Sequence, residues 1–358
     1  MNHWKFEEGD LYLGDCLKIL ASLPEASVDL VIASPPYENA RTYGIDFALE
    51  GQDWVNWMVE VFAACLRVCK GMVAMVIGHG KQEDYKWSAT PALLCADLYR
   101  KGVCLRNPKW FHRVGIPGSG GRDDLRKDVE WIVCATRERG ELPWSDNTAC
   151  GHAPKYGPGG EMSNRTKSGR RMNQWGHSLN SGATVVDEGG VVRSKGRRPS
   201  HKQTTGGQPE AIANPGDLIH AEVGGGLMGS NIAHSNEAPY PDKLPNFFIR
   251  TWCPPCICTS CGNVVKQLTT QTEEPARVPK MRTHDREESL CSSCGADLQK
   301  PGATRIGVVL DCFSGSGTTV AEAIKTGRKF IGIDVRESQI ELTKRRIKQA
   351  RKQKGFGL

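Results

Sequence analysis

The sequence predicts an α/β fold built around a mostly parallel, twisted sheet. Two apolar runs, 28–33 and 71–78, lack the alternation of half-exposed strands and are typical of buried parallel strands, and 129–137 reads as a further strand. Segments with apolar residues at helical spacing separate these runs. From residue 306 onward the chain reads as strand, glycine-rich turn, helix, strand and helix, which is the βαβ arrangement of a doubly wound sheet.

The length and composition allow a sizeable core. The chain has 358 residues, enough for one large domain with insertions or for two domains. Hydrophobic residues make up 39%, and no apolar run approaches the roughly 20 residues that a membrane-spanning helix needs. The N-terminal segment MNHWKFEEGD has no apolar signal core. We therefore expect a cytoplasmic protein with no membrane partner.

The first 140 residues alternate between strand and helix patterns. The predicted elements are a strand at 11–14, a helix at 16–23, a strand at 28–33, a helix at 54–69, a strand at 71–78, a helix at 88–102 and a strand at 129–137. The helix at 88–102 ends near a glycine, as helices often do. This part is expected to supply half of the sheet.

The composition changes between residues 141 and 238, where Gly, Ser, Asn, Arg and Pro dominate and no long periodicity survives. The basic residues gathered here are Arg165, Lys167, Arg170, Arg171, Arg193, Lys195, Arg197, Arg198 and Lys202. Only Glu161, Asp187 and Glu188 oppose them between 161 and 205. Because phosphate contacts rely on clustered Lys and Arg, a polyanion partner is favoured. A disordered linker is the alternative for parts of this stretch.

Helical patterning returns at 239–252, and a cysteine-rich insert follows. Two CxxCG motifs, 29 residues apart, supply Cys258, Cys261, Cys291 and Cys294. Each resembles a zinc knuckle, and four thiolates fit a tetrahedral, structural Zn²⁺ site. Cys253 and Cys256 remain alternative ligands. The chain has fourteen cysteines, but without a signal sequence they argue against a disulfide framework.

A glycine-rich loop near the C-terminus is the candidate cofactor site. It consists of Asp311, Cys312, Phe313, Ser314, Gly315, Ser316, Gly317, Thr318 and Thr319. It lies between a predicted strand and helix, where glycines permit close ligand approach and free N–H groups can bind a carboxylate. Asp334 ends the next strand, 23 residues after Asp311, where it can accept hydrogen bonds from ribose hydroxyls. This order predicts a nucleoside cofactor. The GxGxxG, GKS and GKT sequences are absent from this loop, which disfavours NAD and ATP.

The candidate catalytic loop is Ser34, Pro35, Pro36 and Tyr37, directly after the strand 28–33. Ligands bind at the carboxyl edge of open α/β sheets, and the prolines fix where the Pro35 carbonyl points. The Ser34 hydroxyl and this carbonyl can accept the two N–H groups of an exocyclic amine, which favours the pyramidal nitrogen needed for attack. Tyr37 offers a ring for stacking a flipped base. The plainer alternative is a proline-terminated turn.

Together the two loops resemble motifs of the N4-cytosine/N6-adenine DNA amino-methyltransferase family, which are (D/N/S)PPY and a cofactor motif like DPFSGSGTT. Their order, with SPPY first, resembles the permuted β group. The resemblance covers about 1–137 and 239–350. It implies a Rossmann-like S-adenosylmethionine-dependent methyltransferase fold, circularly permuted, with an irregular target-recognition insert and a small zinc-ribbon insert.

The resemblance also assigns roles along the chain. The implied parts are a catalytic half at 1–140, a basic target-recognition region at 141–238, a return helix at 239–255, a zinc-ribbon-like insert at 256–300 and an S-adenosylmethionine-binding half at 301–358. Asp15 would contact the adenine amine of the cofactor, with Cys16 beside it. Cys312 replaces the usual proline of the family motif, a change expected to leave the cofactor pocket intact.

The implied reaction is methyl transfer to the exocyclic amine of a flipped base in duplex DNA. In this family SPPY favours cytosine N4 and DPPY favours adenine N6, so cytosine N4 is expected and adenine N6 is the alternative. The implied setting is the cytoplasm of a bacterium or phage-infected cell, with a cognate restriction endonuclease as a candidate partner.

Other functions are less well supported by the residues. Methylation of RNA or of a protein glutamine is disfavoured, since release-factor methylases place NPPY after the glycine loop and lack such a large basic region. An inactive, zinc-bearing DNA-binding protein is disfavoured by the intact SPPY and GSGTT sequences. A C5-cytosine methylase is disfavoured because its Pro-Cys-Gln nucleophile is absent; the nearest match is Pro255-Cys256-Ile257.

Overall fold

The structure, a computed structural model, describes residues 2–38, 47–78, 88–115, 125–153, 184–186, 192–194, 213–223, 240–265 and 290–355. The chain divides into two compact units, one formed by Met1–Ala149 with Gly216–Leu358 and the other by Cys150–Pro215. In the described part of the second unit, β8 (Thr184–Val186) pairs antiparallel with β9 (Val192–Ser194). The first unit contains the sheet and the predicted site residues.

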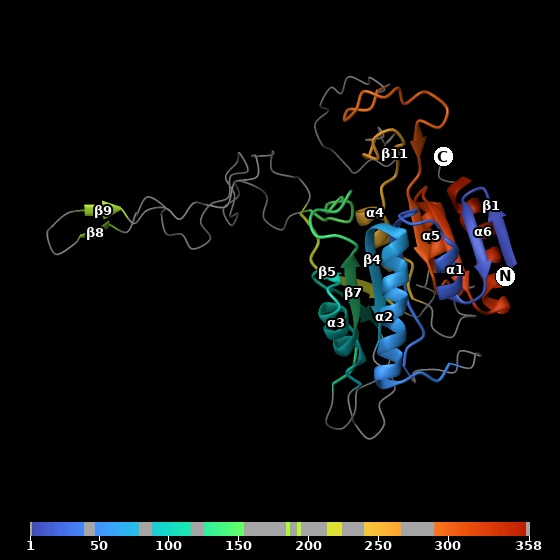
Figure 1. Ribbon diagram of the computed structural model, residues 1–358, viewed down its shortest axis with the longest axis horizontal. Coiled ribbons are helices and arrows are strands. Elements are labelled where there is room, and N and C mark those ends of the chain that lie inside the picture. The colour runs from blue at the N-terminus through green and yellow to red at the C-terminus, as the bar shows by residue number, and fades with distance from the viewer. Residues whose placement is uncertain are drawn as a thin grey trace. The chain divides into compact units, whose positions relative to one another are not determined.

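One sheet of ten strands forms the centre of the described first unit (Figure 1). Its order is β1-β2-β14-β13-β3-β4-β7-β6-β10, and β5 also pairs with β7. The strands are β1 (Asn2–Phe6), β2 (Gly9–Leu13), β3 (Val28–Ala33), β4 (Cys69–Ile77), β5 (Cys104–Leu105), β6 (Lys109–Val114), β7 (Val129–Thr136), β10 (Leu218–Glu222), β13 (Val308–Asp311) and β14 (Lys329–Asp334). Only β1 and β7 run against the others, so the predicted mostly parallel α/β sheet is confirmed.

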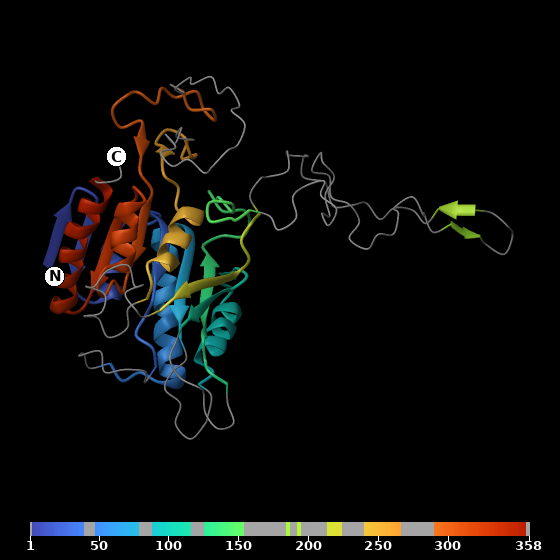
Figure 2. The ribbon, with the colours of Figure 1, turned by 180° about the vertical axis from the view of Figure 1, so that it is seen from behind.

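Helices cover both faces of the sheet (Figures 1 and 2). One face carries α1 (Cys16–Ser22), α2 (Gly51–Val68) and α3 (Thr90–Arg100), and the other carries α4 (Lys243–Trp252), α5 (Thr318–Lys325) and α6 (Glu337–Gly355). In β3, Val31 and Ala33 join the first core while Leu30 and Ile32 join the second. This two-sided burial explains why the strand is continuously apolar. None of the described helices is long and apolar enough to cross a membrane.

The two edges of the sheet carry different features. The carboxyl ends of β3, β13 and β14 meet at one edge, because these strands pair in parallel. At the opposite, amino edge, β7 ends and β10 begins, and the connections to the second unit at Ala149 and Gly216 follow from there. Residues 216–223, which the sequence assigns to the basic region 141–238, thus belong to the first unit, because β10 pairs with β6.

The cysteine-rich insert also joins the amino edge. Its first strand, β11 (Ile257–Cys258), pairs antiparallel with its last, β12 (Thr304–Arg305). The Arg305 guanidinium donates two hydrogen bonds of 2.7 and 2.8 Å to the buried Asp29 carboxylate at the start of β3. The backbone N–H of Val308 donates a third, at 2.9 Å. The base of the insert is therefore fixed to the central strands.

Candidate active site

A cavity of about 680 Å³ opens at the carboxyl edge of the sheet. The SPPY turn after β3 and the glycine-rich turn before α5 both line it, although they lie about 280 residues apart in the chain. The predicted residues in its walls are Asp15, Cys16, Ser34, Pro35, Pro36, Tyr37, Phe313, Ser314, Gly315, Ser316, Thr318 and Asp334. The predicted residues Asp311, Gly317 and Thr319 lie behind the wall instead.

The SPPY turn is held by contacts to α2 and β4. The indole Nε1 of Trp54 donates a 2.9 Å hydrogen bond to the Pro36 carbonyl, which fixes the direction of that peptide. The Ser34 hydroxyl lies 3.1 Å from the Tyr37 hydroxyl and 3.4 Å from the Val76 carbonyl. Because Ser34 has one hydroxyl proton to donate, it can satisfy either partner and still present lone pairs to the cavity.

The Tyr37 ring lies against Gly78, just after β4. A Cβ at this glycine would lie 2.2 Å from Cε2 of the ring, so a larger residue would displace it. The Tyr37 hydroxyl donates a 3.1 Å hydrogen bond to Oε2 of the buried Glu130 on β7. Glu130 in turn pairs with Arg113 of β6 at 3.0 Å. Sequence reasoning missed Glu130, because one acid within an apolar strand gives no pattern.

The glycine-rich turn is shaped around the carboxylate of Asp334. Its two oxygens accept hydrogen bonds from the backbone N–H groups of Gly315 at 2.8 Å and Arg336 at 2.9 Å. Burial raises the pKa of Asp334 above its usual value. Gly317, with φ of 81°, is the N-cap of α5, and a Cβ there would lie within 2.8 Å of the Thr343 side chain. This backbone conformation favours glycine, so the turn requires it.

Tyr240 links the predicted return segment to the cofactor loop. It lines the cavity, and its hydroxyl contacts the hydroxyl of Thr319 and Oδ2 of Asp311, the latter at 3.3 Å. Burial raises the pKa of Asp311 to about 6. Asp311 and Thr319 therefore brace the cavity wall through Tyr240. Its place at the start of the predicted helical segment 239–252 was the available signal, but its contacts depend on the fold.

Arg346 supports the same loop from α6. It is 1% exposed, and its guanidinium donates a 2.9 Å hydrogen bond to the Thr318 hydroxyl. Burial lowers its pKa, which the nearby Glu322 opposes. Sequence reasoning did not single out Arg346, because it is one of many basic residues in this helix.

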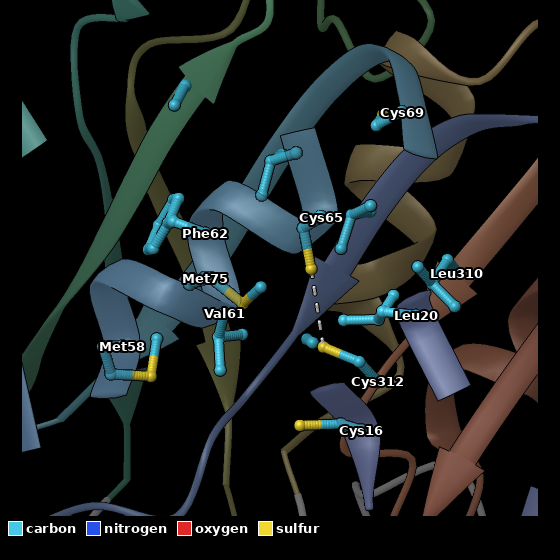
Figure 3. Packing of buried hydrophobic residues seen from close by; sticks show 14 of the residues in the cluster. Cys16, Leu20, Met58, Val61, Phe62, Cys65, Cys69, Met75, Leu310 and Cys312 are labelled. Atoms are coloured by element: carbon cyan, nitrogen blue, oxygen red, sulfur yellow. Dashed lines mark hydrogen bonds between the residues drawn. The ribbon is translucent and has the colours of Figure 1, made fainter. Parts of the chain in front are cut away.

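Cysteine sulfurs pack beneath the cofactor loop (Figure 3). The Cys312 and Cys65 sulfurs lie 3.9 Å apart, and Cys16 belongs to the same buried cluster. Burial raises the pKa of the Cys16 and Cys312 thiols well above the usual value. Neutral, buried thiols behave as small apolar groups, so Cys312 packs the loop against α2 where the family motif has proline.

The rim of the cavity combines a helix cap and aromatic rings. The exposed Asp15 is the N-cap of α1, where its carboxylate accepts a 3.0 Å hydrogen bond from the Lys18 backbone N–H. Trp57 lies between Phe47 and Phe313, with ring centroids 5.1 and 5.6 Å away. Sequence reasoning did not select Trp57, because aromatic residues in amphipathic helices usually belong to the core. It did not select Phe47, because this residue precedes α2 and belongs to no motif.

The four predicted metal ligands lie together in the insert. The sulfurs of Cys258, Cys261, Cys291 and Cys294 are all within 4.8 Å of one another. The Cys258–Cys294 and Cys261–Cys291 separations are 3.9 and 3.7 Å. Tetrahedral Zn²⁺ with bonds of 2.3 Å would place sulfurs about 3.8 Å apart, so the donor set fits this ion.

Both knuckles have the same backbone shape. Gly262 and Gly295 have φ of 74° and 71°, and each donates its N–H to the carbonyl of the first cysteine of its motif. Backbone hydrogen bonds lower the pKa of Cys291 to about 7, which favours the thiolate that binds metal. Cys253 lies in the core beneath α4, where burial raises its pKa, and neither Cys253 nor Cys256 belongs to the four-sulfur group.

Most of the basic residues predicted to bind a polyanion lie outside the described residues. Arg193 is described, as part of β9 in the second unit.

Comparisons with known proteins agree with this geometry. A family model described as DNA methylase, named for N6 and N4 methylation, matches residues 28–265 and 301–345. Type II methyltransferase M.SfiI of Streptomyces fimbriatus is 23% identical over 91% of this chain and 88% of its own length. DNA adenine methyltransferase YhdJ of Escherichia coli is 38% identical over 65 residues, which are 18% of this chain and 22% of its own length.

Among solved structures, PvuII DNA methyltransferase (cytosine-N4-specific) superposes with a TM-score of 0.56 at 16% identity, covering 99% of this chain and 93% of its own. This likeness shows that the fold is the one these methyltransferases share. Because the family model spans most of the chain, and the fold agrees with it, the chain belongs to the N6/N4 family of DNA methylases.

Proposed function

We propose that this protein transfers a methyl group from S-adenosylmethionine to the exocyclic amine of a flipped DNA base, with cytosine N4 as the target. The observation that carries the proposal is the shared cavity, in which the SPPY turn and the glycine-rich turn face the same space. Its volume of about 680 Å³ falls within the roughly 300–1,000 Å³ typical of ligand pockets. A nucleoside cofactor and a single base together suit such a site.

The residues at the glycine-rich side fit the cofactor. The start of α5 offers backbone N–H groups to a carboxylate, and Asp334 lies at the end of β14 where ribose hydroxyls would be. Its carboxylate already orders the turn through Gly315 and Arg336, so the site is preformed. We assign the adenine side to Asp15, Cys16 and the rings of Trp57 and Phe313. The bound cofactor would supply a methyl group activated by its positively charged sulfur.

The residues at the SPPY side fit an exocyclic amine. Ser34 and the Pro35 carbonyl accept its two N–H groups, which concentrates the nitrogen lone pair for attack. The Tyr37 ring, fixed against Gly78, stacks on the base. Positioning of the two reactants and exclusion of water would supply most of the rate.

The choice of cytosine N4 rests on Ser34, because SPPY favours that base among similar sequences. Adenine N6 is the second candidate, and the match of 65 residues to an adenine methyltransferase of Escherichia coli favours it. Both amines would meet the same two acceptors.

Nucleoside mass spectrometry tests the proposal directly. Unmethylated duplex DNA is incubated with the protein and isotopically labelled S-adenosylmethionine, with Ser34→Ala as the matched control. Labelled N4-methyldeoxycytidine is expected. Labelled N6-methyldeoxyadenosine alone would overturn the choice of base. Label in RNA or protein but not in DNA would overturn the proposed substrate.

Two further assignments accompany this function. The four-cysteine group would hold a structural Zn²⁺, because protein sulfur fills all four positions. The basic region 141–238 would contact duplex DNA. It follows a catalytic half at 1–140 and precedes the return helix 239–255, the zinc insert 256–300 and a cofactor-binding half at 301–358. A cognate restriction endonuclease is the proposed partner in the cell.

A further inference from the structure

A buried glutamate of unassigned function, Glu130, accepts a hydrogen bond from Tyr37 of the SPPY turn. Glu130 is 6% exposed and belongs to β7, one of the two strands that run against the rest of the sheet. Its Oε2 accepts the hydroxyl proton of Tyr37 at 3.1 Å, and its Oε1 lies 3.0 Å from the Arg113 guanidinium. Burying a carboxylate is costly, and such groups are frequent at functional sites.

The contact between the Tyr37 side chain and Glu130 of β7 depends on the strand register of the sheet and on one glycine, Gly78. β7 pairs antiparallel with β4, so that Trp131 lies opposite Ile77 and Glu130 comes next to Gly78. The absence of a side chain at Gly78 lets the Tyr37 ring cross the end of β4, because any Cβ would collide with the ring. The local sequence thus keeps open the path between the loop and the acid.

The side chains of Ser34, Tyr37 and Glu130 form a continuous series of hydroxyl and carboxylate groups. Ser34 lies 3.1 Å from the Tyr37 hydroxyl, and that hydroxyl lies 3.1 Å from Glu130. We propose that Glu130 is the terminal acceptor of a proton relay that takes the surplus amine proton through Ser34 and Tyr37. This inference rests on the proposed amine methylation and names a residue that acts in it through two others.

The relay balances the reaction. The nitrogen lone pair forms the new N–C bond, and the electrons of the broken C–S bond leave with the thioether product. The nitrogen then carries a positive charge and one proton too many. That proton passes to the Ser34 oxygen, the Ser34 proton passes to Tyr37, and the Tyr37 proton passes to the Glu130 carboxylate. Glu130 becomes a neutral acid and returns its proton to solvent after product leaves.

Arg113 keeps the acceptor ready. The groups placed against Glu130 in the described part of the chain include the Arg113 cation on β6 and the neutral Tyr37 hydroxyl. A neighbouring cation favours the ionised carboxylate. Arg113 also donates a 2.6 Å hydrogen bond to the Lys127 carbonyl, which fixes its guanidinium at the start of β7.

The test is the single-turnover rate of DNA methylation between pH 3.5 and pH 9, measured with the full chain and saturating S-adenosylmethionine; the range extends to low pH because the Arg113 cation favours the ionised Glu130. The wild type is expected to lose rate as pH falls, because Glu130 becomes protonated. Glu130→Gln keeps an oxygen that accepts from Tyr37 but removes the base. The rate of this variant should fall roughly 100-fold. Its pH profile should no longer show the acid limb, which is the decline in rate at low pH. Arg113→Met should keep the limb and move it to higher pH.

Two controls separate the relay from a structural role. Glu138→Gln makes the same chemical change at an exposed site after β7 and should leave the profile unchanged. Tyr37→Phe keeps the ring but interrupts the series, so it should also lose the acid limb, with cofactor binding retained. An unchanged acid limb in Glu130→Gln or in Tyr37→Phe overturns the relay, even if the rate falls. A wild type that methylates no DNA amine overturns the proposed function itself, and the relay with it.

Discussion

The bridge between Asp29 and Arg305 allows a quantitative test of how the insert is attached to the sheet. The Asp29 side chain is 7% exposed, whereas that of Arg305 is 33% exposed. Arg305→Leu would remove two of the three hydrogen bonds to the buried Asp29 carboxylate and leave the one from the Val308 N–H. Breaking a buried pair from one side costs about 3–5 kcal/mol, and the partial exposure of Arg305 favours the lower value, about 3 kcal/mol.

The double variant Asp29→Asn with Arg305→Leu should be more stable than Arg305→Leu alone. The asparagine oxygen can still accept from Val308, and no unpaired charge remains. The free energy of unfolding is measured in urea by tryptophan fluorescence. Arg137→Leu, which breaks an exposed pair with Glu25, is the control and should cost less than about 1 kcal/mol. The reasoning is refuted if Arg305→Leu costs no more than this control.

Three further predictions follow from the site. Gly78→Ala should lower the methylation rate at least about tenfold while S-adenosylmethionine binding, measured by calorimetry, stays within twofold, because the added Cβ meets the Tyr37 ring and not the cofactor loop. The folded-state pKa of Asp311, about 6, lies above the ordinary 3.8, so its contribution to stability is present below pH 3.8 and is lost as pH rises through 6. The melting temperature of Asp311→Asn relative to wild type should therefore rise across that window, and a constant difference would contradict this cause. Cys291→Ser should lower the zinc content, measured by atomic emission, from one ion per chain to well below one, and equal zinc in both proteins would exclude this cluster.

Much of the fold could be predicted from the sequence. The strand 28–33 was predicted correctly because both faces of β3 are buried, and proline ends it where the loop begins. The strands β6 and β10 were not predicted. Lys109–Val114 and Leu218–Glu222 mix polar and apolar residues. β6 gains its place by pairing with β7 and β10, and β10 by pairing with β6 more than 100 positions away. Local patterns carry no information about such distant pairing.

The parts of the candidate site that are built from sequence motifs could be predicted. The single side chains that enter the site from other elements could not. The SPPY and glycine-rich turns carry their geometry in proline and glycine. Tyr240, Glu130 and Arg346 reach the site from a return segment, an antiparallel strand and a basic helix. Each is one polar residue with no periodic signal, and only the folded arrangement shows its partner.

The separation of the two sheet edges has a consequence for how such a chain can vary. The connections at Ala149 and Gly216 and the base of the cysteine insert all leave from the end opposite the cavity. The described walls of the cavity contain no residue of the second unit or of the cysteine insert, so changes in the length of these segments would leave those walls in place. Natural recombination could thus supply new attachments to an unchanged chemical core.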